Sequence, residues 1–440
     1  MEDQRTSPIP PWLQRLGSRI RLARRARGLT QTDAAGPGLT KSFVSLLESG
    51  RTYPSVGTLV TMAARLQTSL GQLLLDRPQL ARETALNLVM LARESPPNGA
   101  VGLLLDAAET LAGDSDDLQV ELRLTRGDVA ASQDRPKDAD RWFREALTQA
   151  KKRRLQAFEP RALARLAALA FQSGDLNHAR TEVEDALAAF RSSRTLRTVD
   201  GCSALILLGT ILVRNGKPAR ALRNFEDAAR IAERERLGAV LGRAYAGIGQ
   251  AHGAARHFNR AIDSLQRARD KLQAAGDSEG LTVALHQLGR LQLETGQADQ
   301  AQETLEHSTQ LLKEQNDPSL RVEVLTDLAW AQLRAGRIAQ AQSSARSAVA
   351  IAPHTHDSGL RGRALRVQGN VARAQRRFKQ AVEILKESVA TLRRARLPEE
   401  LTGATQELDA LLRDRSAPAE GASEFAGDGA RPRGTSALRS

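Results

Sequence analysis

Apolar residues recur at helical spacing through most of the chain, and the lengths of these stretches divide it into two parts. Residues 14–76 alternate short apolar stretches with capping residues and glycines, which predicts five short helices. From about residue 118 the apolar positions define longer helices that follow one another in pairs. Aromatic residues make up only 3% of the chain, so the core must be built from Ala and Leu, which favours close-packed helices. The pattern predicts an all-α protein.

The second part is an internal repeat of about 40 residues, marked by three small residues in each unit. The first markers are Gly127, Ala167, Gly209, Gly249, Gly289, Ala329 and Gly369. The second markers are Ala139, Ala179, Ala221, Ala261, Ala301, Ala341 and Ala381, and the third are Ala146, Ala186, Ala228, Ala268, Ser308, Ala348 and Ser388. Because small side chains let backbones approach closely, we expect two antiparallel helices per unit that cross at these positions.

Two further positions in each unit support this interpretation. In four units a glycine follows the first marker by seven residues, where a helix end needs a residue with positive φ; these are Gly174, Gly216, Gly296 and Gly336. Large apolar residues four positions after the second marker are expected to fill the gap between neighbouring units; these are Phe143, Phe225, Leu265, Leu305 and Leu385.

The array resembles tetratricopeptide (TPR) repeats with a longer period, and the resemblance covers residues 118–397 as seven repeats. It implies a right-handed superhelix, an α-solenoid. We expect a helical connector or degenerate repeat at 78–117 and a capping helix at 398–415. Residues 416–440 are poor in apolar residues and are expected to be a disordered tail, and residues 1–13 an N-terminal arm.

Residues 29–50 allow two incompatible interpretations. The stretch GPGLTKS resembles a phosphate-binding loop, but Lys41 follows Thr40 rather than the glycine that such a loop requires, and the preceding residues form a basic helix instead of a strand. The alternative is a pair of short helices around a turn at 36–38, with Thr30 and Thr40 as N-caps. The second interpretation fits the residues better.

The same analysis assigns a core to residues 14–77. We expect Gly28 to end a first helix and Gly50 to end the third, Ser55 to cap a fourth, and Ser69 to begin a fifth. The inward-facing residues are expected to be Leu16, Ile20, Leu22 and Ala23 in the first helix, Val44 and Leu47 in the third, Val56, Leu59, Val60 and Ala63 in the fourth, and Leu70, Leu73 and Leu74 in the fifth.

Five short helices in this order resemble the phage-repressor (XRE) helix-turn-helix family, a lambda-repressor-like DNA-binding domain. The matching residues are Thr30-Gln31, Ala35, Ser42, Ser45, Glu48, Gly50, Arg51, Pro54-Ser55, Leu66, Ser69 and Leu73. The spacing from Gln31 to Gly50 is one residue shorter than the usual family pattern.

The resemblance implies that the third helix lies in the major groove of double-stranded DNA. The DNA-binding residues that it implies are Gln31, Thr40, Lys41, Ser42, Phe43, Ser45 and Arg51. Of these, Lys41, Ser42 and Ser45 are the candidates for base edges, Gln31 and Arg51 those for phosphates, and Phe43 would touch a thymine methyl or pack against the backbone. We expect Glu48 to pair with Arg24 and to hold the third helix on the first.

Charge and composition limit the alternatives. Residues 1–77 hold eleven Lys and Arg against five Asp and Glu, so they carry +6 of the net +13 in a sixth of the chain, which favours a nucleic-acid contact there. Cys202 is the only cysteine, which excludes an intrachain disulfide. The sequence suggests no metal site, cofactor or catalytic constellation, and no signal peptide or membrane span, so we expect a non-enzymatic cytoplasmic protein.

The residue after each first marker should face the ligand-binding groove of a TPR array. The candidates for a peptide or protein ligand are Gln250, Arg290, Trp330 and Asn370, with Arg243, His286 and Asp327 nearby. An XRE domain joined to TPR repeats resembles bacterial peptide-sensing regulators of the Rap, PlcR and PrgX group. That likeness implies a transcriptional regulator that binds a near-palindromic operator as a homodimer. The alternatives are a TPR scaffold with a vestigial helix-turn-helix, and a regulator that docks an enzyme on the repeats.

Overall fold

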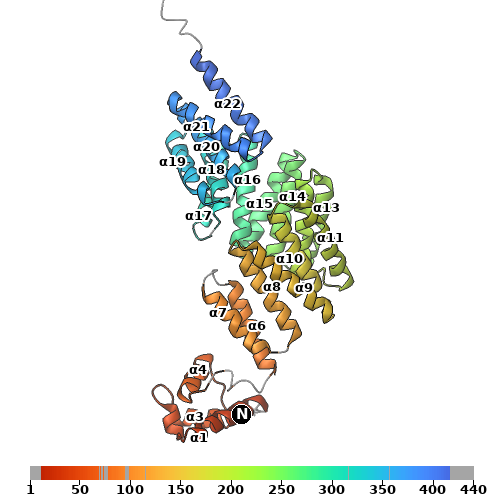
Figure 1. The fold of residues 1–440 in the computed structure, drawn as a ribbon, viewed down its shortest axis with the longest axis vertical. Helices are drawn as coiled ribbons and strands as arrows, with labels where there is room; N and C mark the ends of the chain where they lie inside the picture. Colours follow the sequence, from red (N-terminus) through yellow and green to blue (C-terminus); the bar gives the residue numbers. More distant parts are fainter. Residues whose placement is uncertain are drawn as a thin grey trace, which may run out of the picture. The chain divides into compact units, whose positions relative to one another are not determined.

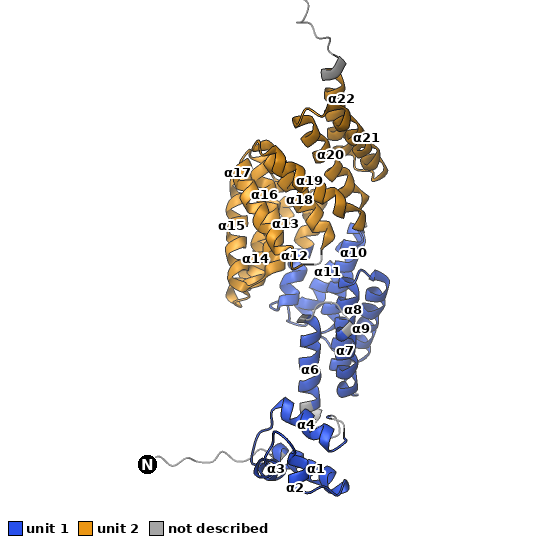
Figure 2. Ribbon diagram, turned by 90° about the vertical axis from the view of Figure 1, so that its left-hand side faces the viewer, with its two compact units in different colours: residues 1–207 blue, residues 208–440 orange. Residues whose placement is uncertain are grey.

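The computed structural model describes residues 11–68, 70, 73, 78–94, 99–113, 115–315, 317–355 and 357–416. Every regular element in these ranges is helical (Figure 1). The chain divides into two compact units, residues 1–207 and 208–440 (Figure 2). Residues 1–10 of the expected N-terminal arm, residues 417–440 of the expected tail and most of the fifth short helix lie outside the described residues. The expected arm is too long at its C-terminal end, because residues 11–13 already belong to the first helix and Leu13 is buried in the core of the domain.

Four short helices open the first unit: α1 (Pro11–Ala26), α2 (Gln31–Ala35), α3 (Lys41–Glu48) and α4 (Val56–Arg65). The three predicted N-caps are confirmed, because Thr30, Thr40 and Ser55 each accept a hydrogen bond from the backbone N–H three residues later. The predicted stops are also confirmed, since Gly28 and Gly50 have φ of +68° and +69°.

The helices pack around a shared core that contains Leu16, Ile20, Val44 and Leu47. Two close approaches between backbones depend on glycine. A Cβ atom on Gly17 of α1 would lie 2.4 Å from the carbonyl oxygen of Leu47 in α3, and one on Gly50 would lie 2.7 Å from Cα of Gln14. These glycines therefore let α3 lie directly against α1.

Three residues expected in this core face outward. Leu22 of α1 is 66% exposed, and Val56 and Val60 of α4 are 73% and 51% exposed. In α4 the core positions are Leu59, Met62 and Ala63, so the buried stripe is turned away from Val56 and Val60. The expectation was wrong for these three residues, because an apolar helix with several candidate faces does not itself show which one a neighbour covers.

The remaining helices follow in antiparallel pairs. The first pair is α6 (Pro78–Glu94) and α7 (Gly99–Ala112). In unit 1 these are followed by α8 (Asp116–Ser132), α9 (Pro136–Lys152), α10 (Glu159–Gln172) and α11 (Leu176–Ser192), and α12 (Val199–Arg214) crosses the division between the units. Unit 2 continues with α13 (Pro218–Arg234), α14 (Gly238–Ala254), α15 (Phe258–Ala275), α16 (Ser278–Glu294), α17 (Ala298–Leu311), α18 (Pro318–Arg334), α19 (Ile338–Ile351), the 3-10 turn η1 (Ala352–His354), α20 (Ser358–Ala374), α21 (Phe378–Arg394) and α22 (Pro398–Ser416).

The small residues of the repeat lie where the two helices of a pair cross. A Cβ on Gly127 would lie 2.3 Å from the ring of Phe143, and one on Gly289 would lie 2.5 Å from Leu305. The large residue also reaches the next pair, since a Cβ on Gly247 of α14 would lie 2.3 Å from Phe225 of α13. In the units that carry a large residue at this position, the repeat thus encodes a knob and a hole, as the sequence predicts.

Candidate nucleic-acid interface

The N-terminal half of α3 presents a polar face to solvent. Thr40 accepts a hydrogen bond from the backbone N–H of Phe43 (3.1 Å), which fixes where the helix begins. Lys41, Ser42 and Ser45 are exposed, whereas Phe43 is half-buried and packs against the core. Three of the residues that the sequence assigns to DNA are therefore on one open surface, and Phe43 stabilises the domain from the edge of that surface.

The C-terminal end of α3 is held by a buried carboxylate. The Glu48 side chain has no exposed surface, and its two oxygens accept hydrogen bonds from Arg24 Nε (2.5 Å) and Arg24 Nη2 (3.1 Å). Arg21 lies 3.6 Å away as a second cation. The predicted pairing of Glu48 with Arg24 is confirmed, and it clamps α3 to α1.

Burial would raise the pKa of Glu48, but the hydrogen bonds from Arg24 and Gln31 and the charges of Arg24 and Arg21 hold the pKa below its ordinary value. Glu48 therefore stays ionised at neutral pH. Arg24 and Arg21 compensate the charge of Glu48. The carboxylate therefore does not cancel the charge of the other exposed arginines of the domain.

Gln31 has a contact that the sequence did not suggest. Its Nε2 donates a hydrogen bond to Glu48 Oε2 (3.0 Å), so the side chain joins the start of α2 to the end of α3. Arg51 is exposed just after the glycine that ends α3. Arg51 is thus open to a phosphate, while Gln31 has a structural role in addition to the phosphate contact implied by the family resemblance.

The candidate ligand residues of unit 2 fall into two groups. In the first group the side chains are bound to neighbouring helices of the same unit. Arg243 Nε donates to Asp277 (2.6 Å), and His286 Nε2 lies 2.8 Å from Asp327 Oδ2. Asn370 Nδ2 donates to Glu407 of α22 (2.7 Å), so the last helix covers the position expected to face a ligand.

The second group is a row on three consecutive first helices of the repeat pairs. Gln250 of α14 and Arg290 of α16 have no side-chain hydrogen bond or ion pair within the described part of unit 2. Trp330 of α18 is half-buried, and the guanidinium carbon of Arg366 lies 5.9 Å from its ring centroid. The sequence places these three residues 40 positions apart, at the same position of successive repeats.

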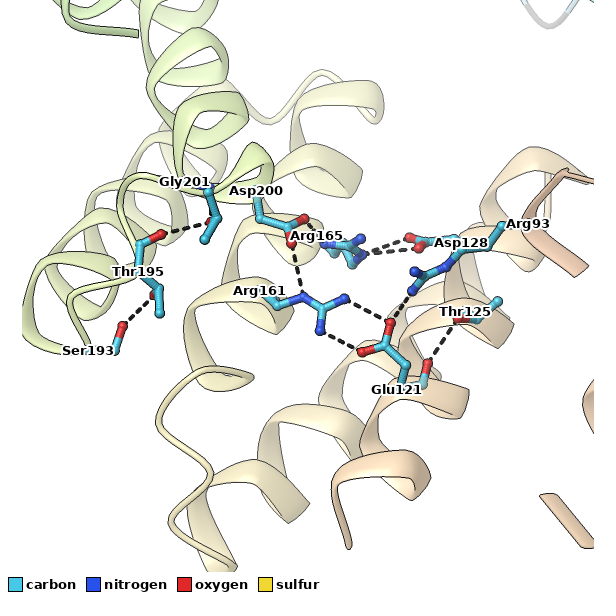
Figure 3. Close-up of polar contacts among 11 residues, drawn as sticks. Arg93, Glu121, Thr125, Asp128, Arg161, Arg165, Ser193, Thr195, Asp200 and Gly201 are labelled. Carbon is cyan, nitrogen blue, oxygen red and sulfur yellow. Dashed lines mark hydrogen bonds and ion pairs between the residues drawn. The ribbon is translucent and has the colours of Figure 1, made fainter. Parts of the chain in front are cut away.

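Unit 1 contains an ionic network on α6, α8, α10 and α12 (Figure 3). Glu121 of α8 accepts from Arg161 of α10 through Nη1 (2.6 Å) and Nη2 (2.9 Å), and from Arg93 of α6. Burial opposes ionisation of Glu121, but the two arginines outweigh it and lower its pKa. Glu121 and Arg161 are 40 residues apart, so they occupy the same position of successive repeats, and this spacing is the signal by which the sequence could have linked them.

The network continues along the same helices. Arg165 Nε donates to Asp128 (3.0 Å), its Nη1 donates to Asp200 of α12 (3.0 Å), and Arg161 Nε lies 3.0 Å from Asp200 Oδ2 (Figure 3). Burial raises the pKa of Asp128, which Arg165 offsets only in part. The pKa of Asp200 is lowered, because both arginines together outweigh the effect of its burial. These charges join successive repeats to one another.

The described residues contain no group of three or more His, Cys, Asp or Glu side chains placed to hold a metal ion. Within the same ranges no helix has both the length and the apolar character needed to cross a membrane.

Comparisons with known proteins agree with these features. A family model described as helix-turn-helix matches residues 20–73, and a tetratricopeptide repeat model matches residues 283–311. No curated protein sequence matches the chain.

Three solved structures have similar folds. A Rap protein complexed with competence and sporulation factor has a TM-score of 0.52 at 11% identity, over 77% of this chain and 99% of that chain. The apo form of the quorum sensor NprR from B. thuringiensis has a TM-score of 0.52 at 13% identity, over 72% and 88%. A signal transduction ATPase with a tetratricopeptide repeat sensor from Pyrococcus horikoshii has a TM-score of 0.51 at 12% identity, over 91% and 69%. At such identities the likeness is one of fold.

The chain therefore carries an XRE-type helix-turn-helix DNA-binding domain at its N-terminus, followed by TPR repeats.

Proposed function

We propose that this protein is a sequence-specific transcriptional regulator that recognises DNA with the outer face of α3 and senses a peptide or protein partner with its repeats. The observation that carries the proposal is the arrangement of α3. Lys41, Ser42 and Ser45 are exposed at its N-terminal end, while the buried Glu48 fixes its C-terminal end to α1. A helix held at one end and polar at the other suits insertion into the major groove.

The exposed side chains differ in what they can recognise. Lys41 can donate to guanine O6 and N7, and the hydroxyls of Ser42 and Ser45 can contact either base type or a phosphate. Arg51 is placed to bind a phosphate and so to set the register of the domain on DNA. The hydrogen bond to Glu48 uses one N–H of the Gln31 side-chain amide, so Gln31 can contact a phosphate only with the second N–H.

We further propose that two copies act together. A single short helix contacts few base pairs, so two helix-turn-helix domains one DNA turn apart would multiply the affinity and recognise a near-palindromic site. The proposal includes a cytoplasmic location and no catalytic activity, in keeping with a regulator that acts by binding.

For the sensing role, we propose the row formed by Gln250, Arg290 and Trp330 as the main ligand contact. Gln250 can hydrogen-bond the backbone of an extended peptide, Arg290 can bind a carboxylate, and the ring of Trp330 can cover an apolar side chain. The row is supported by the contrast with Arg243, His286, Asp327 and Asn370, whose polar groups are already bound within unit 2.

Selection of genomic fragments with the purified full-length protein tests the proposal. We expect enrichment of a near-palindromic site, and we expect Lys41→Ala to weaken binding there by about 1–3 kcal/mol while relaxing the choice of one base pair. Lys217→Ala removes an exposed lysine in the repeats and is the matched control, for which no change is expected.

One outcome of this selection experiment would contradict the proposed sequence-specific recognition. Binding without enrichment, lost steeply with salt and indifferent to Lys41→Ala, would mean that residues 1–77 only attract nucleic acid through their charge. The protein would then be better described as an interaction scaffold.

A further inference from the structure

The connection between α2 and α3 is short and has an unusual backbone. Helix α2 ends at Ala35, and α3 begins at Lys41. Between them Gly36 and Gly38 have φ of +45° and +89°, and Pro37 separates the two. Proline limits one residue of this turn, but the glycines on either side allow many other conformations. The turn therefore does not by itself determine the angle at which α3 leaves α2.

A side chain from α4 supplies the missing restraint. The guanidinium of Arg65 donates hydrogen bonds to the carbonyl oxygens of Ala34 (3.3 Å), Ala35 and Pro37. The first two carbonyls belong to the last turn of α2, where a cation is favourable, and the third lies in the turn. One planar group thus binds both the end of α2 and the segment that leads to α3.

The backbone of the turn is fitted to this guanidinium. A Cβ atom on Gly36 would lie 3.0 Å from Cζ of Arg65, whereas a Cβ on Gly38 would meet no heavy atom within 4 Å. Both glycines have positive φ, but only at Gly36 would an added Cβ meet Arg65. Glycine at position 36 leaves the room that the guanidinium occupies.

Helix α4 gives Arg65 a fixed base. Leu59, Met62 and Ala63 of α4 are buried in the core of the domain, and the backbone of Arg65 continues from them. Hydrogen bonds to base edges lose strength quickly when donor and acceptor are displaced or misaligned. A small rotation of α3 would therefore move Lys41 and Ser42 away from the base edges without unfolding the domain.

We propose that Arg65 is a positioning residue for DNA recognition: by holding the α2–α3 turn, it sets the orientation of α3 and thereby the sequence preference, without contacting DNA itself. This inference rests on the proposed function, since it assumes that α3 recognises base edges.

The test compares affinities for the best selected DNA site and for a scrambled site of the same length, at two salt concentrations, with full-length protein. For Arg65→Gln we expect the ratio of the two affinities to fall about tenfold, as for the loss of a base contact. The affinity for the scrambled site and the salt dependence should change less than about twofold. Arg65→Lys keeps the charge but cannot bind all three carbonyls as a planar fork, so it should restore only part of the ratio.

The two glycines provide an independent and matched pair. Gly36→Ala should lower the ratio in the same way as Arg65→Gln, and the double variant should be no worse than about the poorer single variant, because both changes disturb one contact. Gly38→Ala also places an alanine at a positive φ, but away from Arg65, and should keep the ratio close to that of the wild-type protein.

Three results would overturn the inference. Equal losses on both DNA sites, with a shallower salt dependence, would show that Arg65 binds a phosphate. An unchanged ratio together with a lower unfolding temperature would show a purely structural role. Equal effects of Gly36→Ala and Gly38→Ala would mean that strain in the turn, and not Arg65, sets the preference. If the wild-type protein prefers no site, the proposed function itself fails, which is a different result from a wild-type preference that Arg65→Gln leaves intact.

Discussion

Replacing Glu48 by Gln should unfold much of the helix-turn-helix domain, although the two side chains have nearly the same shape. The Glu48 side chain is fully buried, and that of Arg24 is 11% exposed. Glutamine keeps the volume but leaves the guanidinium of Arg24 buried without its counter-charge. It also removes the ion pair with Arg21 and weakens the hydrogen bond that Gln31 donates to the carboxylate. The cost is therefore electrostatic and not one of packing.

The expected magnitude follows from the burial of the pair. Removing one partner of a buried ion pair costs about 3–5 kcal/mol, against about 0–1 kcal/mol for an exposed pair. A domain of roughly 60 residues has a total stability of only about 3–9 kcal/mol. Glu48→Gln should thus consume most of the stability of this domain and leave the repeats folded.

A tryptophan inside the domain allows it to be followed in the full chain. Trp12 packs edge-on against Tyr53, with ring centroids 5.7 Å apart. In a background in which Trp142 and Trp330 are replaced by Phe, urea unfolding monitored by Trp12 emission reports on the domain alone. We expect the midpoint to fall sharply in Glu48→Gln, while the circular dichroism of the helical repeats keeps its own transition.

Asp33→Asn is the matched control, because Asp33 is an exposed carboxylate of the same domain that caps α2. It should cost about 1 kcal/mol or less. Equal effects of the two substitutions would refute the reasoning, since a buried and an exposed carboxylate would then contribute alike. A small effect of Glu48→Gln combined with normal DNA binding would show that the clamp on α3 is not needed.

The same carboxylate predicts how the domain responds to acid. The pKa of Glu48 is held below its ordinary value in the folded state, so its contribution is fully present above the unfolded-state pKa of about 4.3. The contribution is lost as the pH falls through the lower folded-state pKa. The difference in midpoint between wild type and Glu48→Gln should therefore be constant from neutral pH to about pH 5 and shrink below it.

Two further predictions concern the repeats. Gly127→Ala would place a Cβ 2.3 Å from the ring of Phe143, which is 2% exposed, so we expect a loss of about 1–3 kcal/mol in urea unfolding followed by circular dichroism. Gly102→Ala, where the new Cβ meets no heavy atom within 4 Å, should instead gain up to about 1 kcal/mol. In binding to a positional-scanning hexapeptide library, Arg290→Gln should weaken peptides that carry a fixed Asp or Glu by about tenfold or more. Arg243→Gln should leave that preference unchanged, because Arg243 is already bound to Asp277, and equal effects of the two variants would count against the proposed row.

Features that depend on a few neighbouring residues could be predicted from the sequence. The N-caps at Thr30, Thr40 and Ser55 and the left-handed glycines require only local chemistry. A residue with positive φ ends the first helix in all seven repeat units. In three units this residue is not glycine, so the sequence did not predict its conformation; these are Asp134, Arg256 and Arg376, with φ of +56°, +59° and +60°. At the two arginines the surrounding repeat imposes the conformation against the preference of the residue, whereas aspartate adopts it more readily.

Contacts between distant residues could be predicted only where a pattern linked them. Glu48 and Arg24 are the clearest case, because the resemblance to a known fold places them together. Nothing in the sequence joins Arg65 to the carbonyls of α2, since backbone acceptors carry no residue identity. The partner of Gln31 was missed for a related reason: a residue near a helix start has several possible roles, and only the packing of α3 selects one of them.

The charges of the repeats show why only the structure could separate the sensing row from the other ligand candidates that the sequence predicts. In both compact units, charged residues on the first helix of a repeat pair with charged residues on the helix that occupies the same place in the next repeat. Examples are Glu121 with Arg161, and Arg366 with Glu407 of the last helix. Such pairs join neighbouring repeats and occupy charged groups that a ligand could otherwise bind. Among the described residues of unit 2, Gln250 and Arg290 make no such pair although they occupy equivalent positions of the repeat. Recognition would then depend on which positions are left unpaired, whereas the +6 carried by residues 1–77 would act on the attraction of DNA to the N-terminal domain.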